Sequence, residues 1–151
     1  MKLNYDIATS DDIGVIVELK LEMFREAGIF ELLHENASAI IREDYATLYD
    51  SGKACHHIAR SDENIVAMAG AFIKSDLPYR YFKQSEYGFI GDVYTSPEYR
   101  GLGISTRLNK ELLNWIQQKG INTIRLLATE QGRSNYERLG FCASKEMVLV
   151  I

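Results

Sequence analysis

The sequence predicts an α/β (α+β) domain in which a mixed β-sheet carries helices on both faces. Three observations support this class. Stretches of alternating polar and apolar residues are interspersed with stretches of helical periodicity along the whole chain. A polar turn at 61–64 joins two apolar stretches into an antiparallel hairpin. A glycine-containing turn at 100–103 leads from a strand into an amphipathic helix.

The first third of the chain is predicted to form one strand and two helices. Apolar residues at 3, 5 and 7 alternate with polar ones, as in a strand with one buried face. Apolar residues then recur at helical spacing over 13–24, and Gly28 ends this helix. A second helix is predicted over about 33–49, where apolar residues again share one face.

The rest of the chain is predicted to alternate strands and helices around a loop at 74–85. Gly120 and Gly140 stand where two of these helices end. The predicted elements are, in order, strands at 55–60, 65–73 and 87–95, a helix over 104–119, a strand at 123–128, a short helix at about 132–139 and a final strand within 141–151.

Length and composition are those of an ordinary globular protein. A chain of 151 residues can build its own core, and neither a repeat nor a linker divides it, so we expect one domain over 1–151. The formal net charge is −4 and no basic stripe is present, so a nucleic-acid partner is not expected. The acidic balance mildly favours a cationic or amine substrate, although it serves solubility equally well.

The spacing of the cysteines and histidines predicts no metal site. Together with the lack of long apolar segments, it predicts a cytoplasmic protein. Cys55 and Cys142 lack zinc-type spacing, and reduced thiols are expected in a chain of this size. His56 and His57 are neighbours on a predicted strand and therefore point to opposite faces, while His34 is isolated. No apolar run resembles a signal peptide or a membrane span, so no membrane association is expected.

The strand-to-helix turn is the strongest functional signal. Such a turn aims backbone N–H groups and the positive end of a helix dipole at one point, which suits a phosphate or pyrophosphate. Gly101 and Gly103 permit close approach of a ligand, and Arg100 adds a positive charge. Ser105 and Thr106 offer hydroxyl groups or a helix cap. Taken alone, the pattern fits a turn that binds nothing equally well.

Two motifs in this order resemble the GNAT superfamily of N-acetyltransferases. Residues 100–105, RGLGIS, resemble its [Arg/Gln]-x-x-Gly-x-[Gly/Ala] signature, and the preceding residues 93–99 are similar to its fourth strand. Residues 136–141, YERLGF, resemble its Tyr-x-x-Leu-Gly-Phe ending. Ser105 departs from the usual Gly or Ala, and Thr129 stands where the family often has Asn.

The resemblance implies a sheet of six or seven strands with about four helices, in which strands four and five splay apart around acetyl-CoA. It places the pantetheine arm along Val93, Tyr94 and Thr95, because a strand edge can pair with the arm's amides. It places the pyrophosphate near Arg100. The remaining cofactor-binding residues that it implies are Gly101, Leu102, Gly103, Ile104, Ser105 and Thr106, with Asn135 or Arg133 in place of the missing Asn.

The same resemblance implies acetyl transfer to an amine. Tyr136 matches a family tyrosine near the thiol and is our candidate acid, with core packing as the alternative. Asp92 is our candidate base, with a solvated carboxylate as an equal alternative. Further candidate bases are Glu22, Glu26, Glu31 and Glu130. The N–H of Val93 or a neighbour is expected to stabilise the oxyanion.

The acceptor and the assembly stay open at this stage. Candidates for an aromatic wall at the acceptor site, which could equally be loop packing, are Phe24, Phe30, Tyr79, Tyr81 and Phe82. The acceptor is expected to be a small-molecule or peptide amine, and a homodimer is possible. A CoA-binding regulator without catalysis and a cofactor-free interaction module are the alternative functions.

Overall fold

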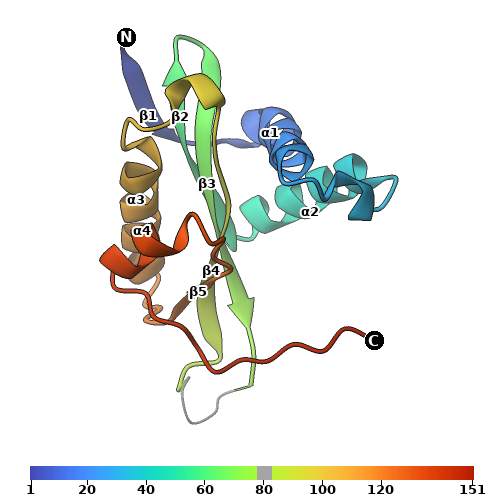
Figure 1. Ribbon diagram of the computed structural model, residues 1–151, viewed down its shortest axis with the longest axis vertical. Helices are drawn as coiled ribbons and strands as arrows, with labels where there is room; N and C mark the ends of the chain where they lie inside the picture. Colours follow the sequence, from blue (N-terminus) through green and yellow to red (C-terminus); the bar gives the residue numbers. More distant parts are fainter. Residues whose placement is uncertain (78–82) are drawn as a thin grey trace.

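The computed structural model describes residues 1–77 and 83–151 and forms a five-stranded sheet between two pairs of helices. Helices α1 and α2 lie on one side of the sheet, and α3 and α4 lie on the other (Figure 1). The elements are β1 (Leu3–Ile7), α1 (Ile13–Glu26), α2 (Ala37–Asp50), β2 (Ala54–Ser61), β3 (Asn64–Ser75), β4 (Glu86–Thr95), α3 (Ile104–Gln118), β5 (Ile124–Leu126) and α4 (Arg133–Arg138). The strand order is β1-β2-β3-β4-β5.

The two sides of the sheet hold separate cores. On the side of α3, the residues Leu108, Leu112 and Ile116 are at most 1% exposed. Gly88 of β4 lies directly beneath this helix, because a Cβ there would come within 2.8 Å of the Ile116 side chain. On the side of α1 and α2, the fully buried residues are Ile16, Val17, Ile58 and Met68. Together the two cores hold β4 rigidly between the helices.

A β-bulge interrupts the pairing of β3 with β4. Two residues of β4, Asp92 and Val93, lie opposite the single residue Ala69 of β3. Asp92 has the left-handed φ of 54°, which is unusual for a residue with a Cβ. The bulge reverses the alternation of the strand, so that Ile90 and Val93 pack toward α3 while Asp92 faces α1 and α2.

The bulge coincides with the end of the pairing between β4 and β5. These two strands are parallel and pair only through residues 88–90 of β4. From Gly91 to Thr95, β4 has no strand neighbour on its β5 side among the described residues. A strand edge without a strand partner is therefore left in the middle of the molecule, and one of its groups, the Thr95 carbonyl oxygen, accepts a hydrogen bond from Arg100 Nε at 2.8 Å.

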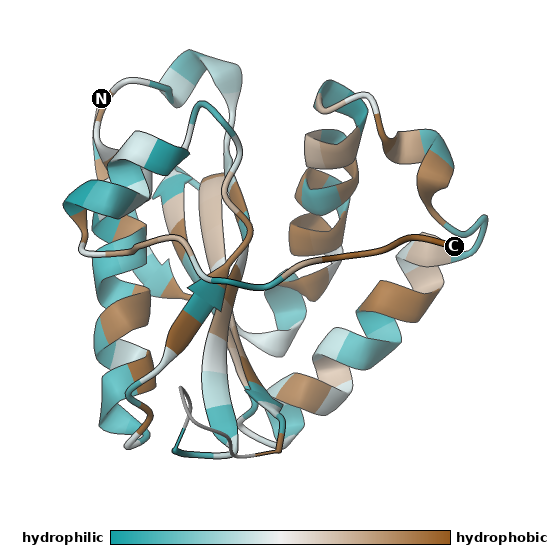
Figure 2. Ribbon diagram, turned by 60° about the horizontal axis from the view of Figure 1, so that its bottom comes forward, coloured by the Kyte–Doolittle hydropathy of each residue, from teal (hydrophilic) through white to brown (hydrophobic). Residues whose placement is uncertain are grey.

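The predicted sheet of six or seven strands is wrong, because residues 1–77 and 83–151 form five. The missing element is the final strand: residues 142–151 are extended but make no backbone hydrogen bond to the described residues. The neighbouring strand β5 has only three residues, so it offers a short edge for pairing. The last five side chains are consequently exposed, and the hydrophobic end of this run is visible in Figure 2.

The second helix also begins later than predicted. A 3₁₀ turn at Phe30–Leu32 precedes it, and α2 starts only at Ala37.

None of the described helices has the length and apolar character that crossing a bilayer requires.

Candidate active site

The turn before α3 presents a row of unpaired backbone N–H groups. Gly101 and Gly103 adopt left-handed φ angles of 76° and 75°, respectively. The six N–H groups of residues 101–106 donate to no acceptor among the described residues. Gly103 is the N-cap residue of α3, and no side chain caps this helix, so Ser105 and Thr106 leave its end open. The α3 dipole and these N–H groups together form an anion-binding cradle.

The cradle faces open space. A Cβ built on Gly101 or Gly103 would meet no atom within 4 Å. Leu102 between them is 54% exposed. A phosphate group can therefore reach the backbone N–H groups without displacing a side chain.

The side chain of Arg100 connects this turn to the end of α1. Its Nη2 donates to Glu26 Oε2 at 2.6 Å, and its Nε donates to the carbonyl oxygen of Thr95 at 2.8 Å. The hydroxyl group of Tyr94 donates to the other Glu26 oxygen at 2.7 Å. Hydrogen bonds from Tyr94 and from Arg100 lower the pKa of Glu26, so this carboxyl is ionised at neutral pH. Burial and the bond to Glu26 raise the pKa of Tyr94 to about 12.

We expect Glu26→Gln to strengthen CoA binding, because it removes a negative charge next to the anion-binding turn. The dissociation constant should fall by about two- to fivefold at low ionic strength. Titration calorimetry measures both dissociation constants. In about 0.5 M salt, screening should abolish most of the difference between the variant and the wild type. Glu22→Gln is the matched control, because Glu22 lies one turn away and pairs with Arg25 at 3.2 Å. An equal gain in both variants would show that only net charge matters.

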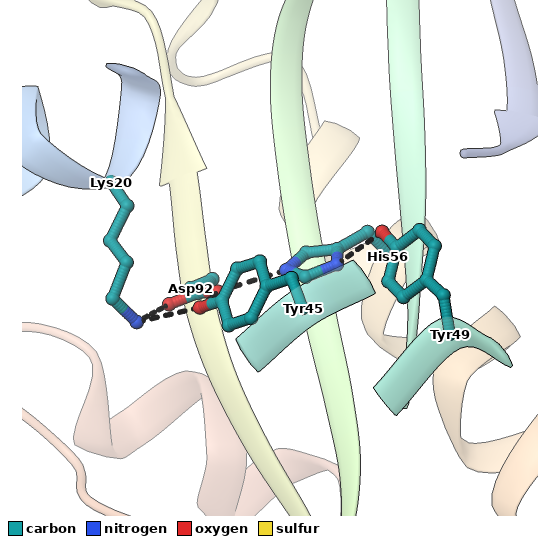
Figure 3. A network of polar contacts seen from close by, with 5 residues as sticks. All are labelled: Lys20, Tyr45, Tyr49, His56 and Asp92. Atoms are coloured by element: carbon teal, nitrogen blue, oxygen red, sulfur yellow. Dashed lines mark hydrogen bonds and ion pairs between the residues drawn. The ribbon is translucent and has the colours of Figure 1, made fainter. Parts of the chain in front are cut away.

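Asp92 lies at the centre of a buried network that joins α1, α2, β2 and β4 (Figure 3). Lys20 Nζ donates to Asp92 Oδ1 at 2.5 Å, and His56 Nε2 lies 2.9 Å from Oδ2. The Tyr45 hydroxyl donates to Oδ2 and accepts a hydrogen bond from Lys20 at 2.8 Å. Tyr49 extends the network, with its hydroxyl group 2.7 Å from His56 Nδ1.

This environment keeps Asp92 ionised. Burial alone would raise the pKa of this carboxyl, whose side chain is 2% exposed. The hydrogen bond from His56 and the charge of Lys20 outweigh burial and hold the pKa below its ordinary value. A carboxylate that already accepts three hydrogen bonds has little affinity for a further proton. The geometry therefore favours a charge-holding role for Asp92 over the role of a base.

The other candidate bases are exposed or occupied. Glu22 forms an exposed ion pair, and Glu26 is held by Tyr94 and Arg100. Glu31 and Glu130 are exposed to solvent. None of these four carboxylates is buried.

Tyr136 is half-buried on α4, with its ring edge-on to Phe141 at a centroid distance of 5.8 Å. Burial raises the pKa of Tyr136, so its hydroxyl group stays protonated at neutral pH. Nearby on α3, Asn109 is 3% exposed, and its Oδ1 has no hydrogen-bond partner among the described residues. Asn135 is exposed and accepts a hydrogen bond from Arg138 at 3.0 Å.

The aromatic candidates are only partly placed by the structure. Phe24 lies beside Lys20, with the ammonium nitrogen 5.7 Å from the ring centroid, and Phe30 stacks under Arg25 at 4.4 Å. The three other candidates lie outside the described residues: Tyr79, Tyr81 and Phe82.

The histidines have separate surroundings. His56 lies in the Asp92 network, whereas burial on the opposite face lowers the pKa of His57. Among residues 1–77 and 83–151, the structure brings no three His, Cys, Asp or Glu side chains together as a metal site.

Comparison with known proteins identifies the family. The model of the Acetyltransferase (GNAT) family matches residues 20–141. The chain belongs to this family. A predicted acetyltransferase of Clostridium acetobutylicum, whose crystal structure holds acetyl-CoA, has the same fold with a TM-score of 0.89. That match has 24% sequence identity and covers 99% of this chain and 96% of the other.

Two curated relatives are similar in sequence. The probable N-acetyltransferase camello of Xenopus tropicalis is 26% identical over 129 residues, which are 81% of this chain and 56% of that protein. An N-alpha-acetyltransferase of Schizosaccharomyces pombe is 38% identical over 63 residues, which are 40% of this chain and 42% of that protein. The chain thus spans about half the length of these two relatives.

Family membership gives the described site its chemical class. The described residues form a mixed α/β GNAT fold with five strands and four α-helices, and the family to which the chain belongs is one of acetyltransferases. The related structure from Clostridium acetobutylicum holds acetyl-CoA. The diphosphate of this molecule is an anion of the kind that the cradle at 101–106 suits.

Proposed function

We propose that this chain transfers the acetyl group of acetyl-CoA to a primary amine of a small molecule or peptide, with residues 1–151 acting as a single transferase domain. One observation carries the proposal. The unpaired edge of β4 at 91–95 and the row of free N–H groups at 101–106 are separated by only five residues of the chain, and they suit the two halves of CoA.

In this proposal the cofactor follows the chain from the cradle to the bulge. The pyrophosphate binds the backbone N–H groups of 101–106, where the positive end of α3 favours an anion. The pantetheine amides pair with the open edge of β4 at Val93 and Thr95. This path brings the thioester to the bulge, next to the point where β5 separates from β4.

The reaction proposed there is direct attack of the neutral amine on the thioester carbon. The N–H of Val93 or a neighbour at the bulge stabilises the negative oxygen of the tetrahedral intermediate. The C–S bond then breaks as the amide forms, and the leaving thiolate takes a proton from the Tyr136 hydroxyl group. The proton that the attacking nitrogen loses passes to water, from which the tyrosinate is protonated again. A raised pKa suits this role, because the hydroxyl group keeps its proton until the thiolate appears.

The acceptor amine must lose its own proton before it attacks. An alkyl ammonium has a pKa of about 10.4. Asp92 and Glu26 are ionised but already hold hydrogen bonds from neighbouring side chains. We therefore propose that water, and not a carboxylate of this chain, takes the proton.

The decisive experiment is a thiol-release screen with acetyl-CoA and a panel of chemically diverse amines. Release of free CoA that depends on one amine class, with the acetylated amine identified by mass spectrometry, supports the proposal. Tight binding of CoA without turnover on a broad panel would favour a CoA-binding regulator. Absence of CoA binding by the folded protein would exclude both functions.

Tyr136→Phe is expected to lower kcat by at least about tenfold, because the thiolate loses its proton donor. The dissociation constant of acetyl-CoA should stay near the wild-type value, since the cradle and the β4 edge are untouched. Tyr5→Phe serves as the control, because Tyr5 is also half-buried and packs on the core that Phe141, the ring neighbour of Tyr136, contacts as well. An unchanged kcat in Tyr136→Phe would remove this residue from the mechanism.

A further inference from the structure

We propose that the buried network around Asp92 holds the β4 bulge in its reactive geometry, so that Lys20 and His56 are positioning residues for acetyl transfer. This inference rests on the proposed function, because it assigns the bulge to the reacting carbonyl group. Lys20 and His56 act through the carboxylate of Asp92, without contact with the thioester. Their role is to fix the bulged residue, which has no partner of its own in the β3–β4 pairing.

The first step of the argument is the backbone of Asp92. Its φ of 54° is left-handed, a conformation that a residue with a Cβ keeps only where its surroundings impose it. The β3 ladder does not impose it, because the register between β3 and β4 shifts at this point. On the other edge, the pairing with β5 has already ended at Ile90. The pairs Gly70–Gly91 and Met68–Tyr94 hold the strand on either side of the bulge, and the Asp92 side chain is a further anchor within it.

The second step is how firmly that side chain is held. Its two oxygens accept hydrogen bonds from three residues, Lys20, Tyr45 and His56, which come from α1, α2 and β2. These elements belong to the rigid core on one side of the sheet. Three anchors on three separate elements leave the carboxylate no freedom to shift without breaking a buried bond.

The third step is the complete satisfaction of the network. His56 is 0% exposed and uses both ring nitrogens, with Asp92 at Nε2 and Tyr49 at Nδ1. A neutral imidazole fits this pattern, with Nε2–H donating to the carboxylate and Nδ1 accepting from the Tyr49 hydroxyl group. The charges of Lys20 and Asp92 then cancel. Removing one partner would leave a buried carboxylate partly unpaired, which is costly.

The space for this ring is also built into β3. Gly70 lies opposite His56 in the sheet, and a Cβ there would come within 2.7 Å of His56 Nε2. Because Gly70 has no side chain, the imidazole of His56 can lie close to the backbone of β3 and reach Asp92. The edge of the Phe72 ring closes the remaining side, at a centroid distance of 5.6 Å from His56.

The last step connects this rigidity to the chemistry. A backbone donor stabilises an oxyanion only when it is preorganised at the place where charge develops. Displacement of such a group by a fraction of an ångström costs rate without preventing substrate binding. The network should therefore affect kcat, while the cradle at 101–106 sets the affinity for CoA.

The test compares His56→Leu, which removes the donor to Asp92, with His56→Gln, whose side-chain amide can donate from the position of Nε2. We expect His56→Leu to lower kcat by at least about tenfold, with the dissociation constant of acetyl-CoA changed by less than about threefold. His56→Gln should recover most of the lost rate. Tyr49→Phe is a milder variant that keeps the donor to Asp92, and a fall of about two- to fivefold is expected for it.

Ile58→Ala is the control for lost stability. Ile58 is fully buried two residues further along β2 and faces the same core, but it is outside the network. Thermal melts place the variants on one stability scale. If Ile58→Ala lost as much kcat as His56→Leu, or if His56→Leu kept the wild-type rate, the positioning role would be overturned.

A second readout does not need an active enzyme. The backbone amide resonances of residues 91–94 should shift or broaden in His56→Leu and return toward their wild-type positions in His56→Gln. Unchanged amide resonances in His56→Leu would overturn the inference. An inactive wild-type protein would refute the proposed function alone, because the amide spectra would still report whether the network holds the bulge.

Discussion

Replacing Gly103 with valine is expected to weaken acetyl-CoA binding by about 100-fold or more while the fold is kept. Gly103 has a φ of 75°, which a β-branched residue adopts only with strain. Its missing side chain also leaves the N–H row at 101–106 open, since a Cβ there would meet no protein atom within 4 Å. The valine would fill the space through which a diphosphate approaches. Titration calorimetry with acetyl-CoA and a thermal melt measure the two effects separately.

The chain offers a close control for this substitution. Gly120 follows the other end of α3, has a φ of 76° and would likewise meet no atom within 4 Å. Gly120→Val therefore introduces similar backbone strain next to the same helix but far along it from the cradle. CoA affinity should stay within about threefold of wild type in this control. Equal losses in both variants would show that backbone strain, and not the cradle, accounts for the effect.

The cradle could be found from the sequence because it is local. Gly101, Gly103 and the start of α3 are consecutive, so their turn and their helix dipole follow from neighbouring residues. The order of strands and helices was predictable for the same reason, since each element has its own periodicity. Only the family resemblance pointed to acetyl-CoA, because an anion-binding turn by itself names no ligand.

The network around Asp92 could not be predicted in this way. Lys20 and Asp92 are 72 residues apart, and His56 and Asp92 are 36 apart. The bulge hides the relation further. Plain alternation over 87–95 would place Ile90 and Asp92 on the same face, whereas the extra residue turns them to opposite faces. The only indication for His56 in the sequence was weak: as strand neighbours, His56 and His57 must point to opposite faces of the sheet.

The final strand was mispredicted for a different reason. Residues 147–151 are all apolar, and such a run is typical of a buried strand. Strand formation also needs a partner edge, which periodicity does not reveal. In the structure β5 ends at Leu126, and the apolar run stays unpaired against the described residues.

The pH dependence of the reaction is expected to follow the acceptor amine and not the protein. The pKa values of Asp92 and Glu26 lie below their ordinary values, so both carboxyl groups are already ionised at the acid end of an assay. Burial raises the pKa of Tyr136, which keeps its proton at the alkaline end. For an alkyl amine of pKa about 10.4, kcat/KM should rise about tenfold per pH unit between about pH 6.5 and 9.

Protein stability should not interfere within this window. A lowered carboxyl pKa stabilises the folded state above the unfolded pKa, and this stabilisation is lost only as the pH falls through the folded pKa. For Asp92 the ordinary value is 3.8 and the folded value is lower, so its contribution is complete over the whole assay range. A fall in rate toward pH 6.5 would therefore not reflect protonation of Asp92.

The measurement uses two acceptors of different basicity from the same active class. With an α-amino group of pKa about 7.7–8.0, the rise of kcat/KM should level off near that value, while an alkyl amine continues to gain rate. The midpoint thus moves with the acceptor when water takes the proton. A midpoint that stayed at one pH for both acceptors would instead identify a base in the protein.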